Sequence, residues 1–127
     1  MPYLQAVIKE GLRMCPPITG LLAKEVPQGG DSFKGYFLPE GTHIGYSIWN
    51  MMRQVETWGN DRNEFRPERW LEASPERLQK MDSVWELVFA HGRWQCLGKK
   101  VALMELNKIF VEVSIFSYLY TLANASE

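Results

Sequence analysis

The stretch that decides the fold is Phe89-Ala90-His91-Gly92-Arg93-Trp94-Gln95-Cys96-Leu97-Gly98, a loop that delivers one cysteine to the start of an apolar helical pattern. Gly92 and Gly98 permit backbone conformations and close approaches that a Cβ would block. A helix that begins near Leu97 would place unpaired N–H groups and the positive end of its dipole beside the sulfur. These effects favour the thiolate of Cys96, which is the form that binds a metal or attacks an electrophile.

The residues around Cys96 favour a flat, apolar partner. Phe89 and Trp94 flank the cysteine, so a planar macrocycle can lie against the loop. A haem whose iron takes the sulfur as its axial ligand satisfies each of these features. A haem-thiolate site is therefore one interpretation of this loop.

The residues alone leave three other interpretations of Cys96 open. A structural zinc site would need two cysteines and two histidines, but the chain lacks the close pairs of zinc-binding motifs. Its candidate ligands are Cys15, His43, His91 and Cys96. A nucleophilic cysteine activated by His91 has no visible carboxylate to orient the histidine. A buried, inert cysteine is the third interpretation, and it does not explain the flanking glycines.

Two further motifs precede the cysteine loop. Residues 3–13 show a helical pattern that the Cys15-Pro16-Pro17 turn ends. Glu10 and Arg13 are neighbours on that helix, where an exposed ion pair contributes only about 0.5 kcal/mol. The predicted apolar face of the helix consists of Leu4, Val7, Ile8 and Leu12. The second motif is Phe65-Arg66-Pro67-Glu68-Arg69-Trp70.

In this order, the three motifs resemble those of the cytochrome P450 family, the haem-thiolate monooxygenases. The family's cysteine loop has the pattern Phe-x-x-Gly-x-(Arg or His)-x-Cys-x-Gly. The residues that match it at the required spacing are Phe89, Gly92, Cys96 and Gly98. The sixth position departs from the pattern, because it holds Trp94, with Arg93 one place earlier. The form Gly-Arg-Trp-Gln-Cys-Leu-Gly is similar to fungal members.

The resemblance implies a role for each motif. The residues expected to hold a haem b are Phe89, Gly92, Arg93, Cys96 and Gly98, with Cys96 as the axial ligand of the iron. Arg93 is expected to reach a haem propionate from its shifted position, and Lys24 lies where many members place an arginine toward the haem. Beyond the haem ligand, no residue of this segment is expected to be catalytic.

The other two motifs are expected to meet in a buried triad of Glu10, Arg13 and Arg69. One carboxylate between two guanidinium groups can accept several charge-assisted hydrogen bonds. Breaking such a buried set usually costs about 3–5 kcal/mol, because an uncompensated charge remains. The triad is therefore predicted to hold the scaffold of the haem site without taking part in chemistry.

The resemblance also implies an activity for a longer protein. Full-length relatives take two electrons from NADPH through a cytochrome P450 reductase-type donor, split O2 and place one oxygen atom in an organic small molecule. The distal oxygen-activating helix, most substrate-contacting segments and any membrane anchor would lie upstream of residue 1. We therefore expect the parent at the endoplasmic reticulum membrane, facing the cytosol.

For this chain we expect the C-terminal, haem-binding part of a cytochrome P450 domain over residues 1–127. Its fold is expected to be mainly α with small β-hairpins, comprising the Glu-x-x-Arg helix, a hairpin region, a meander, the cysteine loop and a final long helix. By itself it is expected to be inactive. The alternative is a non-catalytic truncated remnant with at most weak haem binding.

Composition sets further bounds. The chain has 127 residues, of which 46% are hydrophobic and 23% are charged, and its net charge is −1. This charge gives no reason to expect nucleic acid as a partner. Cys15 and Cys96 form no disulfide framework. The longest apolar stretch, 109–123, contains Glu112 and is shorter than the roughly 20 residues of a membrane span, so it is predicted to be the buried part of the last helix.

The remaining segments predict short elements. A strand is predicted over 18–26, followed by a turn over 27–31. A hairpin is predicted to join 33–37 to 43–48 around a proline-glycine corner. Helices are predicted over 49–56 and from Ser74-Pro75 onward. The apolar stripe of the last helix is predicted to pack in the core, and it comprises Val101, Met104, Ile109, Phe110, Val113 and Phe116.

Overall fold

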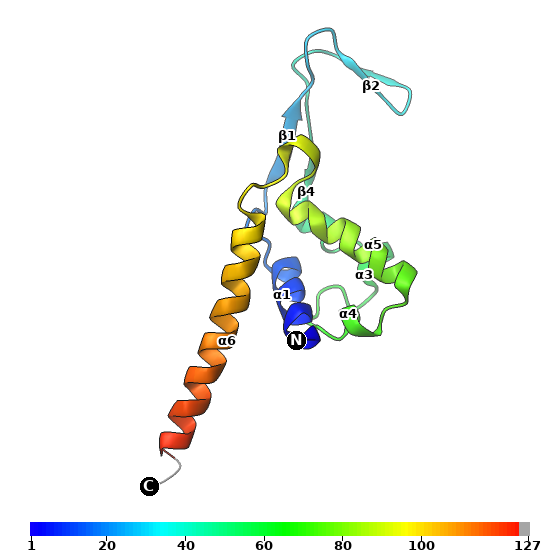
Figure 1. Cartoon of the computed structure of the whole chain (residues 1–127). Helices are drawn as coiled ribbons and strands as arrows, with labels where there is room; N and C mark the ends of the chain where they lie inside the picture. Colours follow the sequence, from blue (N-terminus) through cyan, green and yellow to red (C-terminus); the bar gives the residue numbers. More distant parts are fainter. Residues whose placement is uncertain (125–127) are drawn as a thin grey trace.

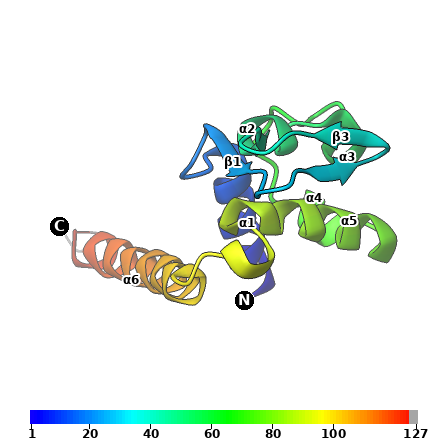
Figure 2. The same cartoon turned by 90° about the horizontal axis from the view of Figure 1, so that it is seen from above.

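A computed structural model describes residues 1–124, so residues 125–127 of the predicted domain lie outside the description. Helices α1, α3, α4 and α5 gather around one core, a narrow β region projects from one end, and the long helix α6 runs past α1 on the other side (Figure 1). Seen from above, α5 and α6 extend to opposite sides of α1 (Figure 2).

The elements follow one another in this order: α1 (Pro2–Met14), β1 (Leu21–Glu25), β2 (Asp31–Phe33), β3 (Tyr36–Leu38), β4 (His43–Ser47), α2 (Ile48–Met51), α3 (Val55–Trp58), α4 (Arg69–Glu72), α5 (Pro75–Trp85), the 3-10 turns η1 (Glu86–Phe89) and η2 (Gly92–Trp94), and α6 (Lys99–Asn124). The predicted class, mainly helical with small antiparallel hairpins, is confirmed. The elements that hold the site are α1, the β1–β4 pair and the segment from α5 to the start of α6.

Helix α1 forms where the sequence predicted it, but its buried side differs from the predicted apolar face. Its four buried residues are Ala6, Ile8, Glu10 and Arg13. Of the predicted face only Ile8 is buried, because Leu4 and Val7 border an apolar hollow between α1 and α6. The helix therefore turns an ion pair, together with apolar side chains, toward the interior.

The strands pair differently from the prediction. Strand β1 pairs antiparallel with β4, from Leu21 opposite Ser47 to Glu25 opposite His43. Strands β2 and β3 form their own hairpin, so the predicted continuous strand over 33–37 is wrong. Lys34 and Gly35 have φ values of 50° and 84°, and two positive φ values in sequence define the tight turn of a two-residue hairpin. The Lys-Gly dipeptide was the signal that the prediction missed.

The short helices after β4 are also more broken than predicted. The single helix expected over 49–56 is two one-turn helices, α2 and α3, with Met52 closing the first. Ser47 caps α2 by accepting a hydrogen bond from the N–H of Asn50 at 3.3 Å. The helix predicted from Ser74 is confirmed as α5, where the Ser74 hydroxyl accepts from the N–H of Arg77 at 3.3 Å.

A row of aromatic rings forms the centre of the core. Trp58 lies 5.5 Å from Trp70, Trp70 lies 6.5 Å from Trp85, and Trp85 lies 5.7 Å from Phe89, measured between ring centroids. The three consecutive ring pairs are tilted or edge-to-face, an arrangement that aromatic pairs favour. All four rings are buried, so the row links the interior beside α1 to the first residue of the cysteine loop.

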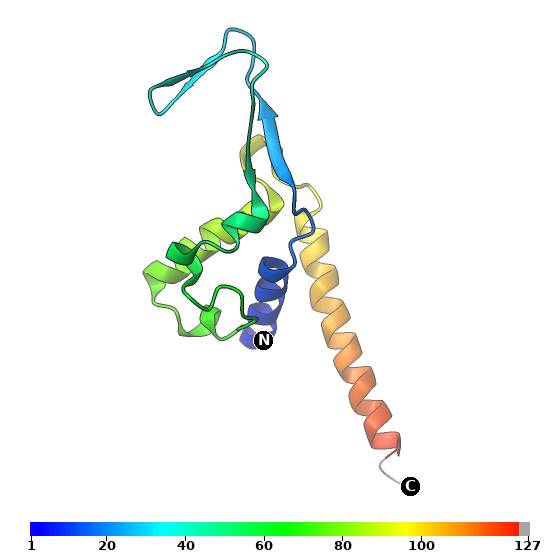
Figure 3. The same ribbon diagram turned by 180° about the vertical axis from the view of Figure 1, so that it is seen from behind.

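Helix α6 differs most from the prediction. The predicted core stripe is exposed, with 41% exposure at Phe110 and 74% at Phe116 as its extremes. Helix α6 packs on α1 through a half-buried strip that includes Ala102, Leu103 and Asn107, and its C-terminal half extends beyond the rest of the fold (Figure 3). The periodicity correctly indicated a helix, but the described residues leave its apolar side uncovered. Within residues 1–124, no helix is sufficiently long and apolar to cross a membrane.

Candidate functional site

The carboxylate of Glu10 lies at the centre of the predicted triad. Arg13 donates to it twice, from Nε to Oε2 at 2.9 Å and from Nη2 to Oε1 at 2.8 Å. Arg69 donates from Nε to Oε1 at 2.9 Å. The three side chains are almost fully buried, so these are charge-assisted hydrogen bonds in a dry interior.

Two further donors to Glu10 were not predicted from the sequence. The backbone N–H of Arg66 donates to Oε1 at 3.0 Å, and the indole N–H of Trp70 donates to Oε2 at 2.9 Å. Burial by itself raises the pKa of the Glu10 carboxyl, but the hydrogen bonds from Arg13 and from the Arg66 N–H outweigh burial and hold the pKa below its ordinary value of 4.5. Both donors come from the predicted Phe-Arg-Pro-Glu-Arg-Trp motif. Its last residue, Trp70, has a side-chain N–H, so the sequence did offer a sign of one of the two donors.

The two guanidinium groups also fix the segment between α2 and α4, which is irregular apart from the one-turn helix α3. Arg13 Nη1 donates to the carbonyls of Met52 and Arg62, at 2.8 and 2.7 Å. Arg69 donates to three carbonyl groups in the same segment, those of Trp58, Asp61 and Glu64. A loop without secondary structure leaves such carbonyls unpaired, and the buried arginines satisfy them. The triad therefore holds α1, α4 and the segment between α2 and α4 (the predicted meander) together.

The cysteine loop begins where the aromatic row ends. The carbonyl of Phe89 accepts a hydrogen bond from the N–H of Cys96 at 2.8 Å, which closes the loop at its base. Gly92 has a φ of 61°, as the prediction of special backbone freedom requires. Ala90 has φ 59° and ψ −171°, a region that is almost restricted to glycine, so the loop holds one strained residue.

The start of α6 differs from the prediction, whereas the role predicted for Gly98 stays a prediction. Helix α6 begins at Lys99, two residues later than expected. A Cβ placed on Gly98 would meet Cys96 Sγ at 3.7 Å, which is an ordinary contact. Within the described residues, the sulfur therefore does not by itself require glycine at this position.

Beside Cys96 lies a hollow of about 550 Å³. Its lining is mostly apolar and comes from three parts of the fold: the turn after α1, the β1–β4 pair and the cysteine loop. The lining residues are Pro17, Ile18, Leu22, Lys24, Tyr46, Val88, Phe89, Ala90, His91, Trp94, Cys96 and Ala102. Cys96 is a free, exposed cysteine, so its sulfur is accessible to a ligand. A broad apolar hollow with one free thiol in its wall fits a haem held by a thiolate.

The cationic residues predicted near the haem gather at Trp94. Lys24 Nζ lies 4.1 Å from the centroid of the Trp94 ring, and the Arg93 guanidinium carbon lies 5.1 Å from it. Lys24 lines the hollow that contains Cys96, whereas Arg93 lines two neighbouring hollows at its edges. The structure therefore brings together two of the cations that the sequence proposed for the haem carboxylates.

In the described part of the chain, the surroundings of Cys96 do not support the three other interpretations of this residue. Residues 1–124 contain no group of three or more His, Cys, Asp or Glu side chains that could hold a metal ion, so the four candidate zinc ligands do not converge. His91 lines the same hollow as Cys96, but no hydrogen bond between the two is present within residues 1–124. A buried cysteine is contradicted by the exposure of Cys96.

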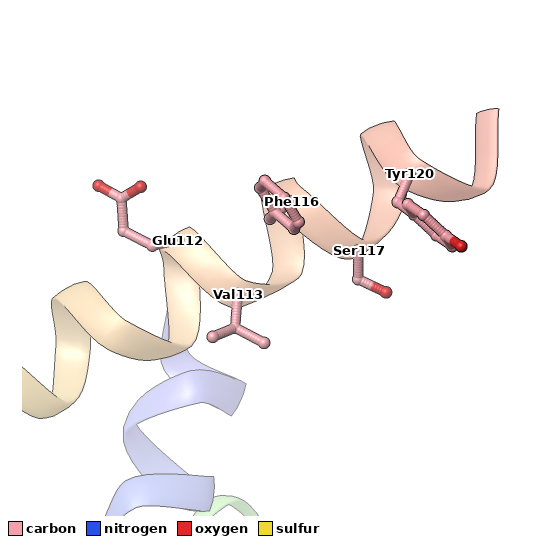
Figure 4. Close-up of a pocket in the computed structure, with 5 residues that line it drawn as sticks. All are labelled: Glu112, Val113, Phe116, Ser117 and Tyr120. Atoms are coloured by element: carbon pink, nitrogen blue, oxygen red, sulfur yellow. The ribbon is translucent and has the colours of Figure 1, made fainter. Parts of the chain in front are cut away.

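A second apolar hollow lies on α6, far along the helix from Cys96. It is lined by Glu112, Val113, Phe116, Ser117 and Tyr120, all from α6 (Figure 4). Figure 4 shows that the five labelled side chains all project from the same helix. The hollow is part of the uncovered side of α6, and its single charged residue offers no chemical constellation.

These features are the ones expected of a haem-thiolate protein, and comparison with known proteins identifies the family. The family model described as Cytochrome P450 matches residues 1–114, and the chain belongs to this family. The matched region contains all three sequence motifs: the Glu10–Arg13 helix, the 65–70 motif and the cysteine loop.

Two fungal relatives and one solved structure show the extent of the likeness. The chain is 52% identical over 113 residues to "Cytochrome P450 monooxygenase ABA1" of Pyricularia oryzae, and the match covers 89% of this chain and 22% of the relative. It is 40% identical to "Pisatin demethylase" of Fusarium vanettenii, with 89% and 21% covered. The structure "Retinoic acid bound cyanobacterial CYP120A1" matches with a TM-score of 0.63 and 28% identity over 84% of this chain and 24% of that one. The chain thus spans about a fifth of the length of the curated relatives it matches.

Proposed function

We propose that this chain forms the thiolate-bearing wall of the haem site in a monooxygenase that oxidises an organic small molecule. The observation that carries the proposal is the free thiol of Cys96 in the wall of a largely apolar hollow, on a loop anchored to the core by the Phe89 carbonyl. When bound, a thiolate-ligated haem supplies oxygen activation, because the sulfur pushes electron density to the iron and favours O–O cleavage.

The residues of the chain have separate tasks in this proposal. Cys96 supplies the axial thiolate, and Phe89 fixes the cysteine's backbone while its ring closes the hollow from the core side. Gly92 gives the loop the positive φ that turns it back toward α6. Arg93 and Lys24 are suited to hold the haem carboxylates. Gly98 is proposed as a site of close approach for the cofactor.

The triad acts only through the scaffold. Glu10 and both arginines are buried and face neither Cys96 nor the hollow, so they cannot touch a substrate. Their contribution is to fix α1 against the segment between α2 and α4. The row of ring contacts from Trp58 to Phe89 connects this part of the core to the cysteine loop.

We further propose an organic small-molecule substrate and an NADPH-cytochrome P450 reductase-type electron donor for the whole protein. The names of the relatives support the substrate class, since one demethylates pisatin and another holds retinoic acid. A location at the endoplasmic reticulum membrane, facing the cytosol, remains part of this proposal.

The test compares the two free cysteines in a full-length protein that carries this segment. Cys96→Ser should abolish the red-shifted Soret band of the CO-bound ferrous form, because that band requires a thiolate ligand. Cys15→Ser is the matched control, since Cys15 is also free and exposed but does not line the hollow, and the band should survive. If the band persisted in Cys96→Ser, the ligand assignment would be wrong. If the unaltered protein took up no haem, the alternative of a non-catalytic remnant would be favoured.

A further inference from the structure

Trp94 is faced by two cations that come from different elements. Lys24 reaches its ring from β1, with Nζ 4.1 Å from the centroid, and Arg93 approaches to 5.1 Å from the cysteine loop itself. Within residues 1–124, neither cation has an ion pair or a hydrogen bond from its side chain. Trp94 is 55% exposed, so the cluster is open to solvent at the edge of the site.

Within residues 1–124 the two cations at this ring have no anionic partner, so an anion bound at this rim would be attracted by both. Like charges repel, and the indole offsets only part of this repulsion, although Trp is the aromatic side chain that attracts cations best. Glu25 and His43 line the adjoining hollow, but Glu25 is not ion-paired with either cation. An anionic group at this rim would therefore complete the charge balance that the chain leaves open.

The position of the cluster shows where that anion would come from. Lys24 and Trp94 line both the apolar hollow of Cys96 and the neighbouring hollow, so they stand at the boundary between the two. Arg93 lines the neighbouring hollow alongside them. A ligand with an apolar body in the first hollow and carboxylates at its edge would bring those carboxylates to the cations.

We propose that Trp94 is a positioning residue that clamps Lys24 and Arg93 for the carboxylate edge of the haem. The inference rests on the proposed function, since it takes haem as the ligand of the hollow. Trp94 stands at the loop position where the family pattern has a basic side chain. It carries no charge, but its ring gathers two charges there, one of them from a strand that precedes the loop by about 70 residues.

The experiment measures cofactor preference. A haem-free form of the full-length protein that carries this segment is titrated with ferric protoporphyrin IX and, separately, with its dimethyl ester, which keeps the macrocycle but lacks the negative charges. The Soret absorbance gives a dissociation constant for each form and reports whether the thiolate binds. The ratio of the two constants isolates the contribution of the carboxylates.

The proposal makes a definite prediction for each variant. The unaltered chain should prefer the free acid, and Trp94→Leu should reduce this preference about three- to tenfold, in line with one or two lost cation–ring contacts. Trp94→Phe should restore part of the preference, because a phenyl ring keeps a weaker attraction for cations. In a Lys24→Gln background, Trp94→Leu should have a much smaller effect.

Trp49 provides the matched control. It is also a half-exposed tryptophan beside an arginine, with the Arg53 guanidinium carbon 3.3 Å from its ring centroid, but it does not line the hollow of Cys96. Trp49→Leu should leave the preference unchanged.

The outcomes separate this inference from the proposed function. If the unaltered chain binds haem through the thiolate but Trp94→Leu keeps the full preference for the free acid, the clamp is refuted and the function stands. If neither porphyrin binds with a thiolate spectrum, the haem site itself is refuted and the clamp with it. If Trp94→Leu does not fold, Trp94→Phe and Lys24→Gln decide, and an unchanged preference in both contradicts the proposal.

Discussion

Removing the charge of Glu10 tests the central contact of the fold. Glu10→Gln keeps the size of the side chain, but its amide NH2 must face donors where the carboxylate accepts five hydrogen bonds from Arg13, Arg66, Arg69 and Trp70. Each charge-assisted bond is worth about 1.5–3 kcal/mol in isolation, but their effects are not additive. Loss of one member of a buried ion set costs about 3–5 kcal/mol, because the remaining charges stay buried without a partner. We expect this loss in the free energy of unfolding.

Tryptophan fluorescence during urea unfolding is a direct assay, because Trp70 donates to Glu10 and its ring contacts Trp58 and Trp85. Glu72→Gln is the control, since Glu72 pairs with Arg66 at the exposed surface and should change stability by no more than about 0.5 kcal/mol. The reasoning would be refuted if the free energy of unfolding of Glu10→Gln lay within about 1 kcal/mol of that of the unaltered chain and the emission spectra were the same. The expected loss is at least about 3 kcal/mol.

Three further predictions concern the loop, the pH dependence and α6. Ala90→Gly should raise the free energy of unfolding by about 1 kcal/mol, because glycine adopts the backbone conformation of Ala90 without strain, and a lower urea midpoint would contradict this. The pKa of Glu10 is lowered in the folded chain, so its contribution is present above 4.5 and is lost as the pH falls below that value; urea midpoints measured against pH should decline there, and less so in Glu10→Gln. Replacing Phe116 and Tyr120 together by serine should reduce concentration-dependent association in sedimentation velocity, since both side chains lie on the uncovered side of α6, and unchanged association would show that another surface is responsible.

Sequence reasoning named the residues that meet in the interior because each motif has a fixed local spacing. Glu10 and Arg13 are separated by one turn of a helix, and Arg69 belongs to a motif that contains a proline. The local sequence therefore identified the three residues, but it did not indicate that Arg69 contacts Glu10. Family resemblance supplied the long-range pairing, which no local pattern contains. The Arg66 N–H donor was invisible for the same reason, since any residue has a backbone N–H.

The errors also have physical causes. An apolar stripe reports that a helix has an apolar side, but it does not report what covers that side, and α6 was therefore placed in a core that the described residues do not build. The hairpin was misplaced because the apolar run through Phe33 and Phe37 outweighed the Lys34-Gly35 turn signal within it. The gathering of Lys24 at Trp94 depends on strand pairing and could not be read from sequence separation.

The triad also sets an order of events during folding. Glu10 and Arg69 are 59 residues apart, and the Trp85 indole donates to the carbonyl of Lys9 across 76 residues, so α1 must wait for partners that are synthesised later. Closing such distant contacts is slow compared with forming local helices. The cysteine loop is attached to Phe89, at the end of the aromatic row, and takes its final shape only after that closure. If the proposed haem binds at this loop, we therefore expect its insertion to follow the docking of α1, so that slower docking of α1 would appear as slower binding of haem.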